Sequence, residues 1–312
     1  MAQGARTLVN AMFTLRQPLA TSLATAVLFL SVADGANPPA AYTVNLAPAN
    51  KVGTKFSMNM DITDESQTHI AMTMPGSTAP QKQEQTREMI AHFEGEAEVL
   101  AVFPNGSIQK ASVAVKTFIA TSDGEPLPGL PGAGAKITAE NADGKKSYEV
   151  DGQPASANVA KLLDEIIDLG NNKYTDQDIF GPTEPVAVNA TWPVNSTMLI
   201  TELKEGNDVA MDGAKGTVKL DAIKGSGESQ VASFSSVFVV QGARPTLPAG
   251  MTVDSMSMSG GIAGTVPSTT MGTEKEVLTA SMQMTAHGSG SGIEIKIDSD
   301  GKQKRVIEVT YH

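Results

Sequence analysis

The chain has 312 residues, no cysteine and a formal net charge of −11 at pH 7. The lack of cysteine excludes disulfides, thiolate metal sites, a cysteine nucleophile and the lipid-bearing cysteine of bacterial lipoproteins. The acidic balance argues against nucleic acid or an anionic membrane surface as the partner.

Residues 1–33 are predicted to be a cleavable export signal. Arg6 and Arg16 supply positive charge, residues 18–33 (PLATSLATAVLFLSVA) are mostly apolar, and Ser31-Val32-Ala33 provides the small residues that signal peptidase accepts. This apolar run is shorter than the ~20 residues of a spanning helix. We therefore expect an exported protein with no integral membrane span after cleavage, working in a bacterial periplasm or outside the cell.

Residues 34–50 contain three prolines and little charge, which predicts a flexible leader. Residues 51–312 are expected to form a single β-rich domain in two halves, 51–170 and 198–312, joined by a Pro/Trp connector at 171–197. Apolar and polar residues alternate with period two in both halves, which is typical of half-buried strands. The alternating runs are 53–62, 68–74, 92–119, 197–203, 216–223, 231–240, 252–266, 276–286, 293–298 and 305–311.

A β-hairpin is predicted in residues 92–119. Pro104-Asn105-Gly106 suits a three-residue loop, because proline starts a type I turn and glycine accepts the left-handed position. Further turns are predicted at Asp143-Gly144 and Asp300-Gly301, and residues 75–86 are predicted to be a polar loop. The three-residue loop predicts the pairs Phe103–Ser107, Ala97–Val113 and Glu94–Lys116.

One amphipathic helix is predicted at residues 156–169, with Ser156 capping its start and Gly170 its end. A lone amphipathic helix must cover an apolar surface. The sequence therefore predicts a mainly β fold, an extended curved antiparallel sheet or open half-barrel with this helix packed across it. Such an architecture is similar to that of periplasmic lipoprotein and lipid carriers, which wrap a half-barrel around an apolar cavity. The apolar face of the helix comprises Val159, Leu162, Leu163, Ile166 and Ile167.

The connector holds Trp192, and its prolines exclude a helix around residues 182–185. The stretch EPVAVNATW resembles the P-V-x-V-G-D-x-W segment of an uncharacterised family of secreted, β-rich bacterial proteins, a domain of unknown function. The resemblance implies a β meander interrupted by a helix, and it brings no established activity. Trp192 is interpreted as a structural plug on the core, with a ligand-stacking platform as the alternative. The matching residues are Pro185, Val186, Val188 and Trp192, with Asn189-Ala190 in place of Gly-Asp.

Four Met-x-Met pairs form the candidate binding site. Residues two apart on a strand point the same way, so each pair presents two thioethers on one face. Three interpretations stay open: adaptable core filling, the wall of an apolar cavity for lipid-like ligands, or a soft-metal site for Cu(I) or silver assisted by His69 and His287. The candidate residues are Met58 and Met60, Met72 and Met74, Met256 and Met258, and Met282 and Met284, with Trp192 as a further ligand-binding candidate.

A second polar pattern places His92, Glu94, Glu96 and Glu98 on one face of a strand. Such a stripe can bind zinc or a hard cation, but a solvated outer face balanced by lysines is the preferred interpretation. The sequence contains no nucleophile elbow, no His-Glu-x-x-His motif and no phosphate-binding glycine loop. It therefore predicts neither an enzyme class nor a cofactor.

Together these patterns predict an exported, non-enzymatic binding module for an apolar ligand or acyl chain on a concave, methionine-rich sheet. Two alternatives stay open. One is a structural or interaction protein of the bacterial envelope without a small ligand, and the other is a soft-metal binder that uses the Met-x-Met pairs. The analogy of architecture does not decide among them, because one fold hosts many functions.

Overall fold

The computed structural model describes residues 40–312 except 48, 78, 143, 172, 205–208, 248–249 and 291–292. The predicted export signal (1–33) and the first part of the predicted leader lie outside the described residues, as does Asp143 of a predicted turn. None of the described helices has the length and apolar character needed to cross a membrane.

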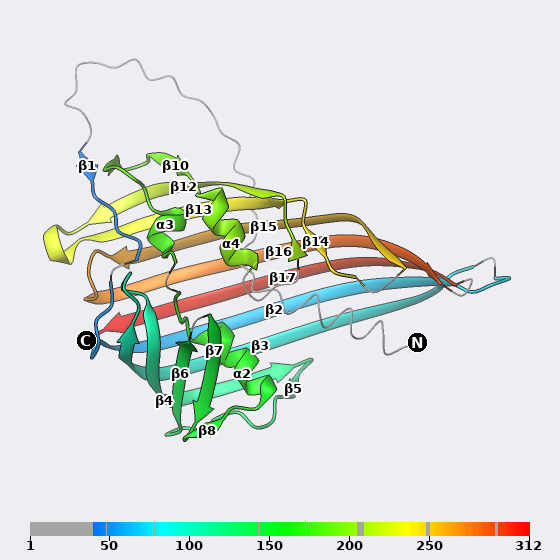
Figure 1. Cartoon of the computed structure of the whole chain (residues 1–312), viewed down its shortest axis with the longest axis horizontal. Coiled ribbons are helices and arrows are strands. Elements are labelled where there is room, and N and C mark those ends of the chain that lie inside the picture. The colour runs from blue at the N-terminus through cyan, green and yellow to red at the C-terminus, as the bar shows by residue number, and fades with distance from the viewer. Residues whose placement is uncertain are drawn as a thin grey trace, which may run out of the picture.

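Thirteen strands of the described chain form one antiparallel sheet with free edges at β10 and β8, which confirms the predicted mainly β, open architecture. Long strands run from a broad end to a narrow end, and β6 and β7 cross them steeply at the broad end (Figure 1). The sheet order is β10-β12-β13-β15-β16-β17-β2-β3-β4-β6-β7-β8, with β5 beside β4. Its strands are β2 (Lys55–Thr73), β3 (Gln81–Val102), β4 (Ile108–Ser122), β5 (Glu125–Pro126), β6 (Lys136–Ala142), β7 (Lys145–Val150), β8 (Gln153–Pro154), β10 (Thr191–Pro193), β12 (Gly213–Lys224), β13 (Val231–Gln241), β15 (Met251–Pro267), β16 (Gly272–Gly290) and β17 (Ile293–Tyr311). Two small pairs lie beside it, β1 (Ala41–Tyr42) with β9 (Val186–Ala187), and β11 (Val209–Ala210) with β14 (Arg244–Pro245).

The last long strand, β17, pairs along its length with the first long strand, β2. Their antiparallel register runs from Glu294 opposite Thr73 to Tyr311 opposite Phe56. This pairing joins the first and the last long strand in the middle of the sheet. Residues far apart in the chain therefore share one continuous inner face, defined here as the face that carries the buried side chains.

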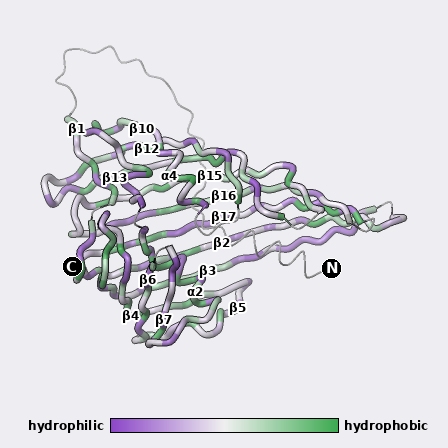
Figure 2. The backbone as a smooth tube through the Cα atoms, viewed as in Figure 1, coloured by the Kyte–Doolittle hydropathy of each residue, from purple (hydrophilic) through white to green (hydrophobic). Residues whose placement is uncertain are grey.

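Alternation along the strands produces this inner face, and Figure 2 shows the resulting changes of hydropathy along each strand. Its buried side chains gather in two hydrophobic clusters. The α2 cluster joins β2, β3, β4 and β6 to helix α2 (Ala157–Ile166) and includes Phe93, Val113 and Leu163. The α4 cluster joins β12, β13, β15 and β16 to helices α3 (Asp176–Phe180) and α4 (Ser196–Lys204) and includes Leu199 and Leu220.

The described residues form three α-helices, where one was predicted, and these lie in front of the long strands (Figure 1). α2 (Ala157–Ile166) starts at the predicted cap, with the Ser156 hydroxyl accepting from Val159 N at 3.5 Å, but it ends before Gly170. Residues 197–203, predicted as a strand, instead belong to α4 (Ser196–Lys204). The carbonyl of Asn195 accepts from Leu199 N at 3.0 Å, and the i,i+4 pair Leu199 and Leu203 is buried. The third helix, α3 (Asp176–Phe180), was not predicted, and a 3-10 turn, η1 (Gly227–Ser229), joins β12 to β13.

Several strand ends also differ from the predictions. Asp300-Gly301 is not a turn, because Gly301 lies inside β17 between Ser66 of β2 and Met282 of β16. The predicted loop 75–86 is shorter, since β3 already begins at Gln81.

The predicted register of the β3–β4 hairpin is confirmed at Ala97 opposite Val113. Glu94 lies opposite Thr117 rather than Lys116, because a bulge between Glu94 and Gly95 shifts the register. At the loop, Phe103 N donates to the carbonyl of Ser107 at 2.9 Å, as predicted.

Candidate ligand-binding cavity

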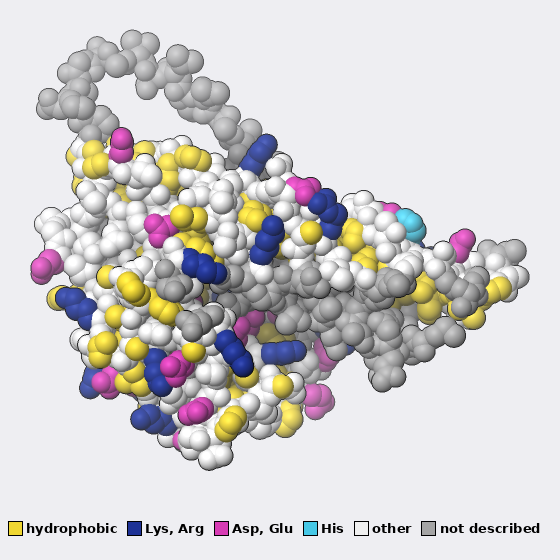
Figure 3. Space-filling view, in the orientation of Figure 1, with side chains coloured by type: hydrophobic (Ala, Val, Ile, Leu, Met, Phe, Trp, Pro, Cys, Tyr) yellow, Lys and Arg dark blue, Asp and Glu magenta, His cyan; other side chains and the backbone are white. Residues whose placement is uncertain are grey.

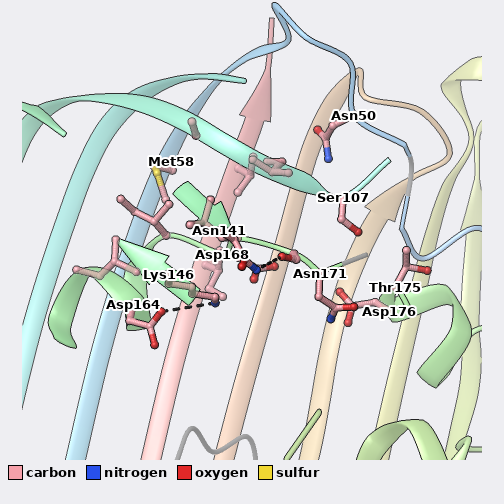
Figure 4. Close-up of a pocket in the computed structure, with 18 of the residues that line it drawn as sticks. Asn50, Met58, Ser107, Asn141, Lys146, Asp164, Asp168, Asn171, Thr175 and Asp176 are labelled. Carbon is pink, nitrogen blue, oxygen red and sulfur yellow. Dashed lines mark hydrogen bonds and ion pairs between the residues drawn. The ribbon is translucent and has the colours of Figure 1, made fainter. Parts of the chain in front are cut away.

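A cavity of about 790 Å³ lies between the inner face and the chain that continues from α2 into α3. Side chains from β2, β16 and β17 form its floor, and residues from α2 to the start of α3 cover it. The loops around Asn50 and Ser107 close one end. Figure 4 shows Met58, Asp168 and Asp176 placed around this space from three different segments.

The central floor of the cavity is apolar. Its residues occupy successive inward positions of two neighbouring strands, where Met58 lies opposite Val309 and Met60 opposite Ile307. The Phe56 and Tyr311 rings meet at one end, with their centroids 5.7 Å apart. Apolar side chains from α2 and the segment after it face this floor, among them Ile166 and Leu169.

Polar contacts hold the covering segment to the sheet. The Tyr148 hydroxyl donates to Asp164 Oδ1 at 2.6 Å, and Lys146 lies 3.5 Å from the same oxygen. Further along, the Asn141 side-chain amide donates to the Gly170 carbonyl at 2.7 Å. These contacts hold the covering segment to β6 and β7 at the edge of the cavity.

A second anchor joins α2 to β17. The Arg305 guanidinium forms an ion pair with the Glu165 carboxylate, and Nη1 donates to the Glu165 carbonyl at 3.2 Å. On the inner face, burial raises the pKa of Asp64 to about 6, while the charge of Arg305 lowers it. Arg305 therefore stands between two carboxylates, one on the helix and one on the sheet.

Five carboxylates converge on the other side of the cavity from four separate segments. The pKa of Asp176 is raised to about 8, first by burial and then by nearby carboxylates, of which Asp168 acts most strongly. Burial likewise raises the pKa of Glu274 to about 7, although a hydrogen bond from Tyr311 lowers it. Burial and then the charge of Glu274 raise the pKa of Glu276 well above its usual range. The fifth member is Glu202 of α4.

Asp176 lines the cavity but keeps an exposed side chain, so solvent screening weakens the effect of burial and of the neighbouring charges on its pKa. Within the described part of the chain, no three histidine or acidic side chains are arranged as ligands of one metal ion. The five carboxylates are called the carboxylate wall below: Asp168, Asp176, Glu202, Glu274 and Glu276.

The structure places the four Met-x-Met pairs in different surroundings. Met58 and Met60 line the cavity and are buried in the α2 cluster. The pairs Met256/Met258 and Met282/Met284 belong to or pack against the α4 cluster, outside the cavity lining. Met72 packs against the same cluster, whereas Met74 is exposed just beyond the end of β2.

The remaining candidates also lie away from the cavity. His69 and His287 have exposed side chains and occupy strand positions of opposite parity to the methionine pairs. His287 Nδ1 lies 2.6 Å from Asp254 Oδ1, on the outer face. Neither histidine faces the thioethers.

Trp192 packs against the α4 cluster from β10, where it lies opposite Val218. Its indole Nε1 donates to the Phe180 carbonyl at 2.6 Å. The turn before it places Asn189 at a φ of 70°, a left-handed conformation that asparagine tolerates. The indole thus joins the connector to α3 and is absent from the cavity lining.

The stripe of His92, Glu94, Glu96 and Glu98 lies on the outer face of β3. His92 Nδ1 lies 2.7 Å from Asp61 Oδ1, and its Nε2 lies 3.4 Å from Glu94 Oε1. Glu96 pairs with Lys116 and Glu98 with Lys55. Figure 3 shows the same interspersed arrangement of both charges across the visible broad end. Local ion pairs therefore account for this stripe.

The carboxylate wall was not predicted from the sequence. One signal was available, since Glu274 and Glu276 share the even-numbered frame of Leu278, Ala280 and Met282 on β16, which marks inward positions. Asp168, Asp176 and Glu202 carry no comparable local signal. Only the tertiary arrangement brings them to the same wall.

Comparisons with known proteins add little. No protein-family model matches the chain, and no curated protein sequence does. Among solved structures, a lipovitellin structure described by its lipid–protein interactions aligns at 9% identity with a TM-score of 0.28, over 84% of this chain and 25% of that chain. The *P. putida* toluene transporter TodX aligns at 6% identity with a TM-score of 0.10, over 88% of this chain and 95% of that chain. At these TM-scores, neither likeness establishes a common fold.

Proposed function

We propose that this protein is an exported, non-enzymatic binding module that holds a ligand with an apolar body in the cavity beneath α2. The carrying observation is the cavity of about 790 Å³ with an apolar central floor formed by β2 and β17. Its volume falls within the range of small-molecule sites, and its mixture of apolar walls and a few polar groups is typical of such sites. Met58 and Met60 are the two methionines of the candidate pairs that serve this role.

The carboxylate wall limits which polar groups the proposed ligand can carry. Above its raised pKa of about 7, Glu274 is ionised, and a free carboxylate entering beside it would meet like charge in a confined space, where repulsion is stronger than in bulk water. A hydroxyl, ester or amine can instead accept or donate hydrogen bonds to these groups. The proposed ligand is therefore an acyl or alkyl chain with a neutral or cationic polar end.

The experiment measures binding of hexadecanol, by native mass spectrometry and by competition with a fluorescent alkyl probe. Val309→Phe places a larger side chain on the cavity floor. Val306→Phe, three residues away on the same strand, places the same side chain on the outer face and is the matched control. Val309 lines the cavity, whereas Val306 is 36% exposed.

Binding that is lost in Val309→Phe and kept in Val306→Phe supports the proposal. Equal binding by both variants would show that the alkyl chain lies elsewhere. If the wild-type chain binds neither hexadecanol nor the probe, the cavity proposal is overturned and the interaction-protein alternative takes its place.

A further inference from the structure

The strand register brings two of the Met-x-Met pairs together. On the antiparallel strands β15 and β16, Met256 lies directly opposite Met284, and Met258 directly opposite Met282. Opposite residues in such a ladder have Cβ atoms about 4.5–5.5 Å apart, and residues two apart on a strand share a face. The four side chains therefore form a two-by-two block on the inner face.

The surroundings of this block are apolar. Met258, Met282 and Met284 are 4%, 3% and 2% exposed, and Met256 packs against the same α4 cluster. Val240 of β13 lies opposite Met258 on one side of the block. Ser299 of β17 lies opposite Met284 on the other side, where its hydroxyl is 3.0 Å from that of Thr68. No described aspartate, glutamate or histidine occupies these neighbouring inward positions.

We propose that Met256, Met258, Met282 and Met284 bind a soft monovalent metal ion, Cu(I) or Ag(I), between β15 and β16. Neutral thioethers in an apolar site select soft ions of low charge, whereas Mg²⁺, Ca²⁺ and other hard ions require oxygen ligands that this block lacks. The three rotatable bonds of each methionine let the sulfurs converge without moving the strands. This site is independent of the alkyl-binding cavity.

The pair Met58/Met60 on β2 has no second methionine pair opposite it. Met58 and Met60 face Val309 and Ile307 on one side and Gly95 and Phe93 on the other. They present two thioethers with no sulfur opposite them. Replacing them removes the same number of methionines from the protein and leaves the proposed site intact.

The experiment titrates the full chain with Ag(I), which undergoes no redox reaction, and follows heat and the methionine methyl NMR signals. Met282→Leu with Met284→Leu should weaken Ag(I) binding at least about tenfold, since even outer-shell changes at metal sites cost that much. Met58→Leu with Met60→Leu is the control and should change it less than about twofold. Leucine conserves volume well enough to keep both variants folded.

The wild-type NMR titration is a test that does not depend on the variants. Four methionine methyl signals should shift together and saturate at one equivalent of Ag(I), and the β15 and β16 substitutions should identify them. The proposal is overturned if no methyl signal shifts, if the shifting signals belong to other methionines, or if both double variants weaken binding equally.

Discussion

The α2 cluster and the α4 cluster are built on one sheet from the same alternating pattern, yet they share the cavity unequally. The α2 cluster supplies most of its apolar lining, and the α4 cluster adds Leu46, Tyr174 and Ile179. In the α4 cluster, large inward side chains such as Phe234 and Phe238 fill the space below the helices. Beside the α2 cluster, the inward positions of β16 change from apolar residues to Glu274 and Glu276. A cavity opens where two carboxylates interrupt the apolar frame and the covering segment is held by polar bonds.

The two clusters also differ in the surroundings of their methionine pairs. Met60 and Met282 have similar spacing to a partner methionine and similar burial, at 4% and 3% exposure. One lies on the floor of the cavity, and the other lies in a block of four. Position within the sheet therefore decides whether a methionine pair lines the cavity or lies opposite another pair.

Deleting one core side chain from each cluster should produce the largest effects and should separate the two regions. Leu163 of α2 and Leu220 of β12 are both fully buried. Each change to alanine should lower the free energy of unfolding by about 2–5 kcal/mol, measured by urea denaturation. Leu163→Ala should also weaken hexadecanol binding, because α2 carries the cavity cover, whereas Leu220→Ala should leave it within about twofold. Loss of binding in Leu220→Ala alone would move the site to the α4 cluster.

The carboxylate wall should make stability fall as pH rises. Asp176, Glu274 and Asp64 have pKa values raised to about 8, 7 and 6, so the folded protein holds protons that the unfolded chain releases above about pH 4. Unfolding then releases protons, and the free energy of unfolding decreases between about pH 4 and about pH 8 and levels off above it. The melting temperature measured across this range tests the sign.

Asp176→Asn provides the control for this pH dependence. It removes one titrating group while keeping the shape of the side chain, so it should reduce the slope and raise the melting temperature at the alkaline end. A wild-type melting temperature that rises from about pH 5 to about pH 8 would contradict the raised pKa values of these carboxyl groups.

Much of the sheet was predictable because the inward-facing residues of an unbroken strand are all odd-numbered or all even-numbered. The inward-facing apolar residues of β17 keep odd numbers from Ile295 through Ile307 to Tyr311, on both sides of Gly301. A two-residue hairpin at Asp300-Gly301 would pair odd with even positions and so would require the inward set to change parity. The unbroken frame therefore indicates one long strand, and turn-forming residues alone were misleading.

Other features of the fold could not be predicted from short segments of the sequence. The pairing of β17 with β2 joins the two ends of the domain, and no short segment encodes it. In α4, the β-branched residues suggested a strand, while the cap at Asn195 and the Leu199/Leu203 spacing were the correct signals. The cavity depends on both, because its floor comes from β2 and β17 and one wall carboxylate comes from α4.

Replacing Glu274 and Glu276 of the carboxylate wall should change which polar end the cavity accepts. At about pH 8, above the pKa of about 7 of Glu274, the double variant Glu274→Gln, Glu276→Gln should bind palmitate about tenfold more tightly than the wild-type chain does, equivalent to about 1.4 kcal/mol of relieved repulsion. Its affinity for hexadecanol should stay nearly constant, and its affinity for hexadecylamine should fall. Glu308→Gln on the outer face, where Glu308 pairs with Lys275 at 2.8 Å, is the control. Unchanged palmitate binding in the double variant would place the polar end of the ligand away from β16.

The smallest predicted effect concerns Trp192, for which the sequence left a structural plug and a ligand platform open. Trp192→Phe keeps most of the packing against the α4 cluster but removes the hydrogen bond from Nε1 to the Phe180 carbonyl. The loss should be about 0.5–1.5 kcal/mol of unfolding free energy, followed by circular dichroism because the variant has no tryptophan left to fluoresce. Since Trp192 does not line the cavity, hexadecanol affinity should not change. A variant of normal stability that fails to bind hexadecanol would reverse this assignment, making the indole a platform for the ligand and separating binding from the cavity beneath α2.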